Sequence, residues 1–304
     1  MEKGIQYFQG ITDSYSAKVG LLLESLPYIK KYFHRIVVVK VGGAMMEDES
    51  MLKHVLEDLV LMKYVGIKVV LVHGGGKQIS RLMQEKGIKP RFVDGLRITD
   101  KQVMEIVKMV LVGEVNSKLV SLLNQHGKIA MGISGNDASF IHCQKRKYAK
   151  QGRDVDLGYV GHIVDIDASF VTDILDDGFM PVIATLGVDQ KGHVYNINAD
   201  TCASEIAVAL GAEKLISLTD VDGIMRVVDG KKKLVSAITK KMGMDMIASG
   251  EIDQGMIPKV VACIDALDGG VGRAHILNGN KPHSVLAEIF TDKGIGTMIV
   301  KEDV

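Results

Sequence analysis

Two glycine-rich loops are the residues of this sequence best suited to hold a negatively charged ligand. Lys40–Gly43 (KVGG) and His73–Gly76 (HGGG) each end an apolar, β-branched run of the kind that forms a buried strand. Adjacent glycines leave backbone N–H groups uncovered, so these groups can converge on an anion, above all just before a helix begins. Such loops can also serve only as tight turns, but two of them after consecutive strands favour ligand binding.

A polar cluster in the second half of the chain offers the charges that an anion site requires. Asn196–Asp200 (NINAD) opens a predicted helix, which Asn198 or Asp200 could cap. Two asparagines and an aspartate exceed what a cap needs. Farther along, Thr219–Gly223 (TDVDG) makes a polar turn after a strand, and Lys259 follows a proline that suits the first turn of a helix. A lone lysine is commonly a surface residue, but this context favours a functional role for Lys259.

Several well-known phosphate and nucleotide motifs are absent from the sequence. The P-loop pattern G-x-x-x-x-G-K-[ST] does not occur, because Gly76-Lys77 is followed by glutamine and Gly127-Lys128 by isoleucine. The dinucleotide pattern G-x-G-x-x-G, the metalloprotease pattern H-E-x-x-H, the nucleophile elbow G-x-S-x-G and the kinase H-R-D set are also missing. The glycine loops therefore do not indicate a P-loop NTPase.

The chain around these loops alternates short strands with helices. The predicted strands are Ile36–Val41, Lys68–Val72, Lys128–Ile133, Met180–Ala184, Leu215–Leu218 and Ala274–Leu277. Helical periodicity marks Glu49–Tyr64 and the stretch near Gln78–Glu85. This alternation predicts an α/β fold, an open and mostly parallel sheet sandwiched by helices. Ligands of such sheets bind at the carboxyl ends of the strands, where both glycine loops fall.

Two segments depart from this alternation. Residues 140–170 have strand-like alternation around a basic run, which predicts a β-hairpin excursion. Residues 11–33 predict an extra amphipathic helix before the first core strand. Its apolar stripe consists of Val19, Leu22, Leu23, Leu26, Ile29 and Phe33. The stripe needs something to pack on, and the sequence favours the chain's own domain and another subunit equally.

The composition excludes several classes of protein. The 304 residues suggest two domains, with a boundary near residue 195. Lys and Arg (37) balance Asp and Glu (37), so no overall basic field indicates nucleic acid or an anionic membrane as a partner. Cys143, Cys202 and Cys263 are far apart and odd in number, which disfavours a disulfide framework or a zinc knuckle. With no apolar signal core and no apolar run of about 18 residues, we expect a soluble, cytoplasmic protein.

Six blocks, in their order and spacing, resemble the amino acid kinase family and, within it, the acetylglutamate kinase branch. The blocks are Lys40–Gly43, His73–Gly76, Gly95–Thr99 (GLRIT), Asn196–Asp200, Thr219–Gly223 and Gly255–Val260 (GMIPKV). The glycine loops resemble the whole family, whereas GLRIT and NINAD resemble that branch in particular. The resemblance implies the amino acid kinase fold. It also implies transfer of the γ-phosphoryl group of ATP, with Mg²⁺ as cofactor, to the γ-carboxylate of N-acetyl-L-glutamate, the second step of arginine biosynthesis.

The resemblance implies catalytic roles for five residues. Lys40 is expected on the β,γ-phosphate side of the transferring group and Lys259 towards the leaving ADP. Asp200 is expected to hold both lysines in place. Backbone N–H groups of Gly43 and Gly75 are expected to donate to the phosphoryl oxygens. The acceptor carboxylate is already ionised at neutral pH, so the reaction requires cations and positioning and no general base.

The resemblance also implies how the two substrates bind. Arg97 is expected to clamp the α-carboxylate of N-acetylglutamate with its planar fork, while Asn196 contacts that carboxylate and the acetamido group. Gly74 and Gly75 are expected beside the same substrate. The nucleotide is expected at Lys40, Thr219, Asp220, Gly223 and Lys259. No residue is expected to ligate the metal, because the ATP phosphates hold Mg²⁺.

Residues 11–33 and the C-terminal segment resemble the arginine-sensitive, hexameric part of that branch. The resemblance implies that the helices interlace dimers into a homohexamer and that L-arginine inhibits the enzyme. The implied effector residues are Lys214, His275, Glu288, Gly294 and Gly296. The implied organisation is an interlacing helix over 1–33, an N-acetylglutamate-binding and dimerisation lobe over 34–195, and an ATP-binding lobe with the effector segment over 196–304. A nitrogen-signalling protein is a candidate partner.

Other functions remain open from the sequence. A kinase of the same family could act on glutamate, aspartate or carbamate. Free glutamate presents an ammonium group, so its site should offer a nearby carboxylate in place of apolar room for an acetyl methyl group. A non-catalytic arginine sensor with the same fold is disfavoured by the intact Lys40, Asp200 and Lys259. A nicotinamide oxidoreductase is disfavoured by the missing glycine fingerprint.

Overall fold

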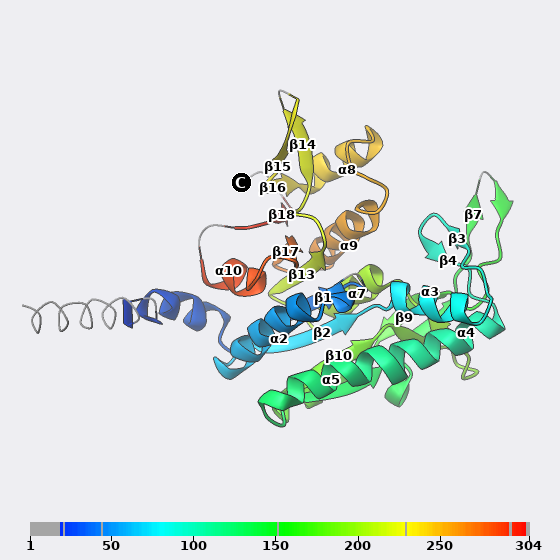
Figure 1. Ribbon diagram of the computed structural model, residues 1–304, viewed down its shortest axis with the longest axis horizontal. Coiled ribbons are helices and arrows are strands. Elements are labelled where there is room, and N and C mark those ends of the chain that lie inside the picture. The colour runs from blue at the N-terminus through cyan, green and yellow to red at the C-terminus, as the bar shows by residue number, and fades with distance from the viewer. Residues whose placement is uncertain are drawn as a thin grey trace, which may run out of the picture.

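An eight-stranded sheet runs through the middle of the protein, in the order β16-β18-β17-β13-β1-β2-β10-β5 (Figure 1). This computed structural model describes residues 19–20, 22–43, 45–150, 152–228, 230–291 and 294–301. The strands of the sheet are β1 (Ile36–Val41), β2 (Lys68–His73), β5 (Ala130–Ser134), β10 (Met180–Ala184), β13 (Lys214–Thr219), β16 (Ala237–Thr239), β17 (Arg273–Asn278) and β18 (Thr297–Val300). The six strands from β5 to β17 pair in parallel, and β18 is antiparallel to β17. The prediction of an open, mostly parallel sheet is confirmed.

Helices cover both faces of this sheet, which is why its strands are apolar almost without interruption. In β1, Val37 and Val39 pack into one core and Val38 into the other. The first core contains residues of α2 (Glu49–Tyr64), α3 (Gly76–Glu85), α4 (Lys101–Lys108), α5 (Ser117–Leu123) and α10 (Ser284–Phe290). The second contains residues of α6 (Ala168–Asp176), α7 (Ala199–Ala209), α8 (Lys240–Ala248) and α9 (Ile257–Asp268). The predicted helix over Glu49–Tyr64 matches α2 at both ends.

A second, four-stranded sheet has the order β12-β11-β6-β9. Its strands are β6 (Ile141–Lys145), β9 (Gly161–Ile166), β11 (Leu186–Val188) and β12 (Val194–Asn196). β6 and β9 are antiparallel and are joined through the short pair β7 (Ala149–Lys150) and β8 (Arg153–Asp154), so the predicted hairpin over 140–170 is confirmed. Two more hairpins are β3 (Phe92–Val93) with β4 (Leu96–Arg97), and β14 (Met225–Val228) with β15 (Lys231–Leu234).

The main sheet is continuous across the predicted domain boundary near residue 195. β1 from the first predicted lobe pairs in parallel with β13 from the second. The division into lobes over 34–195 and 196–304 therefore stays a prediction. The three cysteines are buried and free.

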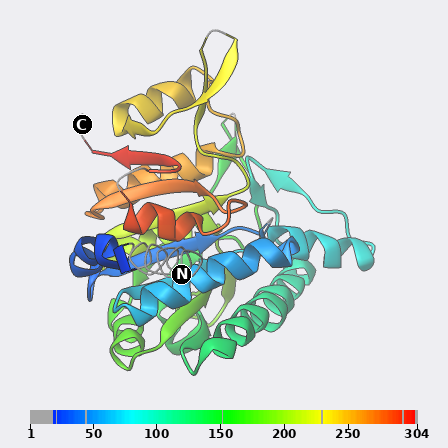
Figure 2. The same cartoon turned by 60° about the vertical axis from the view of Figure 1, so that its left-hand side comes forward.

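The segment before β1 leads away from the body of the protein (Figures 1 and 2). Residues 22–32 are helical, while residues 11–18 and 21 of the predicted helix lie outside the described residues, so the full helix over 11–33 stays a prediction. Leu22, Leu23 and Leu26 are 71%, 63% and 42% exposed. The described part of the chain thus leaves much of the predicted apolar stripe uncovered. Within the same described part, no helix has the length and apolarity needed to cross a lipid bilayer.

Candidate active site

The predicted site residues meet at one edge of the central sheet. Because β1, β2 and β13 are parallel neighbours, the loops that follow them lie side by side. Lys40 near the end of β1 is the register partner of Ser217 on β13. Asn198 caps α7, because its side chain accepts hydrogen bonds from the backbone N–H groups of Asp200 and Thr201. The cap is therefore Asn198, which leaves the carboxylate of Asp200 free to act in the site.

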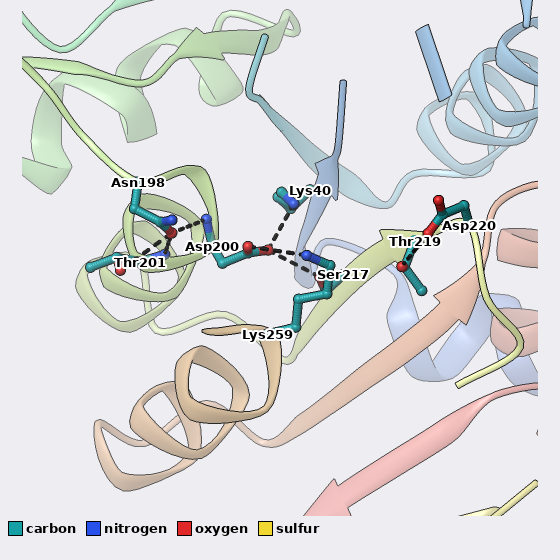
Figure 3. A network of polar contacts seen from close by, with 8 residues as sticks. All are labelled: Lys40, Asn198, Asp200, Thr201, Ser217, Thr219, Asp220 and Lys259. Carbon is teal, nitrogen blue, oxygen red and sulfur yellow. Dashed lines mark hydrogen bonds and ion pairs between the residues drawn. The ribbon is translucent and has the colours of Figure 1, made fainter. Parts of the chain in front are cut away.

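Asp200 joins two lysines that come from different elements (Figure 3). Lys40 Nζ lies 2.7 Å from Asp200 Oδ1, and Lys259 Nζ lies 3.4 Å from Asp200 Oδ2. The hydroxyl of Ser217 donates a hydrogen bond to Oδ1 at 3.5 Å. Lys40 and Asp200 are 4% and 8% exposed. The three charged residues that the sequence placed at the centre of the reaction are brought together, and Ser217 joins them.

Two opposing effects set the charge of Asp200. Burial disfavours the ionised carboxylate, but the charges of Lys40 and Lys259 outweigh burial and hold the pKa of Asp200 below its usual value. Burial also lowers the pKa of the Lys40 ammonium, and Asp200 opposes that change. Asp200 is therefore ionised at neutral pH. Two cations around one carboxylate leave the cluster with a net positive charge, which suits an incoming phosphate.

Gly43 and Gly75, one from each glycine loop, lie where a side chain would crowd the site. A Cβ on Gly43 would lie 3.0 Å from Gln78 Oε1 and 3.3 Å from the backbone nitrogen of Gly76. A Cβ on Gly75 would lie 2.8 Å from Leu111 Cδ2. Gly75 is also the residue before α3, which begins without a side-chain cap. An uncapped helix N-terminus between two glycine loops is a suitable place for an anion.

His73 adds no charge to the site. It is fully buried, and burial lowers its pKa to about 4, so its ring is neutral at physiological pH. Its Nδ1 lies 3.1 Å from the carbonyl oxygen of Gly74, and its Nε2 lies 3.0 Å from Asn116 Nδ2. With Asn116 donating to Nε2, the proton is assigned to Nδ1. His73 thus holds the second glycine loop in place through the carbonyl oxygen of Gly74.

Arg97 on β4 lines the same cavity as Lys40, Asp200 and the glycine loops. Its guanidinium donates to the carbonyl oxygen of Gly76 at 2.7 Å and to Ser80 Oγ at 2.8 Å, and it lies 4.7 Å from the ring centre of Phe92. Burial lowers the pKa of Arg97 to about 10, so the side chain is charged at neutral pH. A guanidinium has five N–H donors, and these contacts leave donors over for a bound carboxylate. Arg97 is positioned as a clamp would be.

The charged residues and glycines line one cavity of about 200 Å³. Lys40, Asp200, Arg97 and Asn196 contribute to its wall, and Asn196 Nδ2 donates a hydrogen bond to a threonine hydroxyl at 3.3 Å. The cavity also has apolar lining residues that the sequence analysis did not name: Ile79, Phe92, Leu111 and Val160. Within the described part of the chain, Asp200 is the only carboxylate in the lining. The cavity therefore combines a polar end with an apolar wall.

Leu111 belongs to a π-helix, Met109–Asn116, between α4 and α5. π-Helical turns are rare and often occur at functional sites. The buried Asn116 at its end donates to the carbonyl oxygen of Val182 on β10 at 2.8 Å as well as to His73. The sequence analysis missed this wall, because the run MVLVG is apolar throughout and shows no period that distinguishes a π-helix from an α-helix or a strand.

The predicted nucleotide residues Thr219, Asp220 and Gly223 lie beyond the cavity, at the end of β13. Figure 3 shows Thr219 and Asp220 directed away from the Asp200 cluster, and none of the three lines the cavity. Gly223 has φ +137°, and a Cβ there would lie 2.6 Å from Thr297 Oγ1, so this turn requires glycine. The lysines occupy both oxygens of Asp200, so the described residues of the lining offer no free carboxylate for a metal.

A second cavity, of about 300 Å³, gathers all five predicted effector residues. Its lining includes Lys214, His275, Glu288, Gly294 and Gly296, together with Tyr28, Lys31 and Tyr32 from the segment before β1. Glu288 Oε1 lies 3.0 Å from Lys214 Nζ and 2.9 Å from His275 Nε2. Burial disfavours the charged form of Glu288, but the hydrogen bond from His275 and the charge of Lys214 outweigh burial and hold its pKa at about 2. Among the described residues, Glu288 Oε2 is buried without a hydrogen-bond partner.

Comparison with known proteins gives a consistent result. The model of the amino acid kinase family matches residues 35–278. The acetylglutamate kinase of Caldicellulosiruptor bescii is 49% identical over 287 residues, which cover 94% of this chain and 98% of that protein. The N-acetylglutamate synthase from Neisseria gonorrhoeae, solved with coenzyme A and N-acetyl-glutamate, has a TM-score of 0.83 and 28% identity over 94% of this chain and 64% of that longer chain. Its complex with coenzyme A and L-arginine has a TM-score of 0.78 and 27% identity over 93% of this chain and 65% of that chain.

Proposed function

The chain belongs to the amino acid kinase family and is a kinase, and we propose that it phosphorylates the side-chain carboxylate of N-acetyl-L-glutamate with ATP. The product is N-acetyl-L-glutamyl 5-phosphate, and the reaction belongs to arginine biosynthesis. One observation carries the proposal: Lys40 and Asp200 line the same cavity as the glycine loops and Arg97, and Lys259 pairs with Asp200 at its edge. The identity to a curated acetylglutamate kinase, over nearly the full length of both proteins, supports this choice of substrate.

The reaction is a direct displacement in which the substrate carboxylate attacks the γ-phosphorus and ADP leaves. The attacking carboxylate is ionised at neutral pH and needs no base to activate it. Two anions must approach each other, so Lys40 and Lys259 neutralise the phosphoryl oxygens. N–H groups of Gly43 and Gly75 donate to the same oxygens in the transition state. Asp200 takes no proton and holds both ammonium groups in position.

Magnesium enters this reaction as part of the MgATP substrate. The lining of the cavity provides one carboxylate, Asp200, and both of its oxygens contact lysines. Mg²⁺ bound to substrate phosphates keeps several waters and needs few protein ligands. The phosphates of the bound nucleotide would hold the ion, which would offset part of their charge. Thr219, Asp220 and Gly223, beyond the cavity, are left for the rest of the nucleotide.

The apolar wall favours an acylated amino acid as substrate. Leu111, Phe92 and Val160 offer contact to a methyl group, and no described residue of the cavity lining offers a free carboxylate to pair with an ammonium group. A coupled assay with ATP and Mg²⁺ therefore should show much faster turnover of N-acetylglutamate than of glutamate, aspartate or carbamate. Equal or faster turnover of one of the other acids would assign the chain to a different activity of the same family. If none of these acids were turned over, the result would favour a non-catalytic binding protein with the same fold.

Replacing Arg97 by alanine should chiefly raise KM for N-acetylglutamate, by roughly 10-fold or more, and leave KM for ATP nearly unchanged. The physical reason is that a clamp on the α-carboxylate acts equally in the ground state and the transition state, so its loss appears in KM. Steady-state kinetics with each substrate varied in turn provide the measurement. Arg81→Ala is a matched control, because Arg81 is exposed and pairs with Glu114 outside the cavity. A larger rise in KM for ATP would place Arg97 on the nucleotide side.

The second cavity is proposed to bind L-arginine as a feedback inhibitor. The free oxygen of Glu288 suits a guanidinium, and Lys214 suits a carboxylate. A synthase of the same fold, whose similarity covers 93% of this chain and 65% of the synthase, was solved with L-arginine bound. Arginine contacts in this cavity would touch the helix before β1, so binding could bias the arrangement of that helix. Inhibition follows if the arrangement that binds arginine better is the less active one.

Glu288→Gln should therefore retain activity and lose inhibition by millimolar arginine. Glutamine keeps the shape and the contacts to Lys214 and His275 but removes the charge that would pair with the guanidinium. Rate measurements against arginine concentration test this expectation, with Glu251→Gln as control, since that exposed glutamate pairs with Arg226 elsewhere. Full arginine inhibition of Glu288→Gln would remove the cavity from the proposal.

The exposed leucines of residues 22–26 support the further proposal that the chain forms a hexamer through its N-terminal helices. A stripe that the described residues leave uncovered needs a partner, and another subunit supplies one. Light scattering should give a hexamer for the full chain and a dimer after deletion of residues 1–26. A full-length dimer, or a hexamer that persists after the deletion, would contradict this arrangement. The cytoplasmic location and a nitrogen-signalling partner stay predictions.

A further inference from the structure

A cluster of two histidines and a glutamate lies between α2 and α10, away from both cavities. His54 and Glu57 are one turn apart on α2 and therefore share a face of that helix. His283 directly precedes α10, with φ +56°. One ligand atom from each of the three side chains lies within 4.8 Å of the others, and the two imidazole rings meet edge to face at 4.8 Å between centres. Neither proposed cavity includes any of these residues.

A buried carboxylate fixes the orientation of His283. Its Nδ1 lies 2.6 Å from Oδ1 of Asp58, which is fully buried on α2. The other oxygen of Asp58 accepts the backbone N–H groups of Val285 and Leu286 at 3.2 and 3.3 Å, so Asp58 also caps α10 from a distance. With Nδ1–H donating to Asp58, Nε2 of His283 keeps its lone pair. A carboxylate behind a histidine is the arrangement that orients imidazole ligands in metal sites.

His54 supplies an atom that the protein leaves unsatisfied. Among the described residues, its Nδ1 is buried without a hydrogen-bond partner, and it lies 3.7 Å from Glu57 Oε2, too far for a hydrogen bond. Buried polar atoms without a partner are uncommon in folded proteins. The side chains of His54, Glu57 and His283 are still 33%, 34% and 48% exposed, so an ion from solution can reach them. A cation between the nitrogen and the carboxylate would satisfy both.

We propose that His54, Glu57 and His283 bind a divalent transition-metal ion of the zinc class, with water as the fourth ligand. Two imidazoles and one carboxylate are a common zinc ligand set, whereas magnesium and calcium take oxygen ligands. Zinc–ligand bonds of about 2.0–2.1 Å place tetrahedral ligand atoms about 3.3 Å apart. Separations of up to 4.8 Å thus need small rotations of partly exposed side chains. The ion would fasten α2 to the first residue before α10, the helix that carries Glu288.

Zinc binding to the metal-free, full-length protein tests the proposal. Titration against a chromophoric chelator should show one ion bound per chain more tightly than any other. Glu57→Gln and His283→Asn should each weaken that site by roughly 10-fold or more. Asparagine is chosen because it tolerates the positive φ at position 283. Cobalt added to the wild type should give the visible absorption of a tetrahedral site, and Glu57→Gln should lose it.

His193→Ala is the matched control for adventitious binding by surface histidines. His193 is exposed and its Nδ1 lies 2.9 Å from Asp189, so it resembles His283 but lies outside the cluster. This variant should bind the tight ion as the wild type does. The proposal is overturned if Glu57→Gln binds zinc with wild-type affinity, or if His193→Ala weakens the site as much as Glu57→Gln. If His283→Asn fails to fold, Glu57→Gln alone decides, because the ion pairs of half-buried Glu57 are with Lys53 and His54 on its own helix.

Discussion

Lys40→Met should lower kcat by roughly 10²-fold or more. Methionine keeps much of the length of the side chain but removes a positive charge that lies 2.7 Å from Asp200 at the end of β1. A single preorganised charge or donor on the developing transition state is typically worth about 2.7–4 kcal/mol. Because each 1.36 kcal/mol corresponds to about a tenfold change in rate, this loss amounts to roughly 10²- to 10³-fold. Lys259→Ala should have an effect of the same order.

A lysine outside the site provides the comparison for these variants. Lys68 is the first residue of β2, at the opposite end of the strand that neighbours β1, and its Nζ pairs with Asp176. Lys68→Met removes the same charge from an ion pair between the same sheet and α6, so it should keep kcat within about twofold if charge at the phosphoryl group is what matters. Circular dichroism confirms that each variant is folded. Near-normal kcat in folded Lys40→Met or Lys259→Ala would refute the catalytic assignment.

Asp200→Asn should also lower kcat by roughly 10²-fold, although Asp200 contacts neither substrate in the proposed reaction. Asparagine fills the same volume but no longer attracts two ammonium groups, and misplacement of a catalytic group by about 1 Å can reduce the rate to this extent. Steady-state kinetics should show the loss mainly in kcat. Asp176→Asn, which removes the carboxylate partner of Lys68, should leave kcat nearly unchanged. A folded Asp200→Asn enzyme with normal kcat would mean that the lysines hold their positions without it.

The pH profile of the wild type separates this holding role from general-base catalysis. The pKa of Asp200 is lowered in the folded protein, so its ion pairs persist above the ordinary aspartate pKa and are lost only as pH falls below it. We therefore expect kcat to stay level from about pH 7 down to about pH 5. A decline of kcat with a midpoint near pH 6 would instead indicate a base with a raised pKa.

The parts of the fold that the sequence predicts are those with a local signal. Strands β1 and β2 are short, β-branched and buried on both faces, and α2 has a clear helical period together with an aspartate cap, Asp48. The glycine loops can be recognised in the sequence because each contains adjacent glycines. The carboxylate and lysines of the site were identified through their sequence blocks, and the parallel strands bring them together because Lys40 and Ser217 share a register position.

The parts that the sequence does not predict depend on contacts between distant segments. Leu111 lines the cavity only because Asn116 and the sheet hold a π-helix in place. The Asp58–His283 contact spans 225 positions, and neither residue carries a motif. Strands β16 and β18, at one end of the main sheet, have 3 and 4 residues, too few to show a period of two. Local pattern therefore locates the catalytic charges but not the wall that surrounds the substrate.

The width of the substrate cavity depends on which side chain of the π-helix over Met109–Asn116 faces it. Each residue of an α-helix turns by about 100°, so deletion of one residue between Leu111 and Asn116 would turn the Leu111 side chain by about that angle relative to Asn116. Asn116 is tied to β2 and β10, so the turn would fall on Leu111 and not on the anchor. A single insertion or deletion in the π-helix, between Leu111 and Asn116, is thus enough to exchange the residue that faces Gly75. Lys40, Asp200 and Lys259 would stay in place. In such a scaffold, a mutation can change the size of acceptor that fits the cavity without changing the residues that carry out phosphoryl transfer.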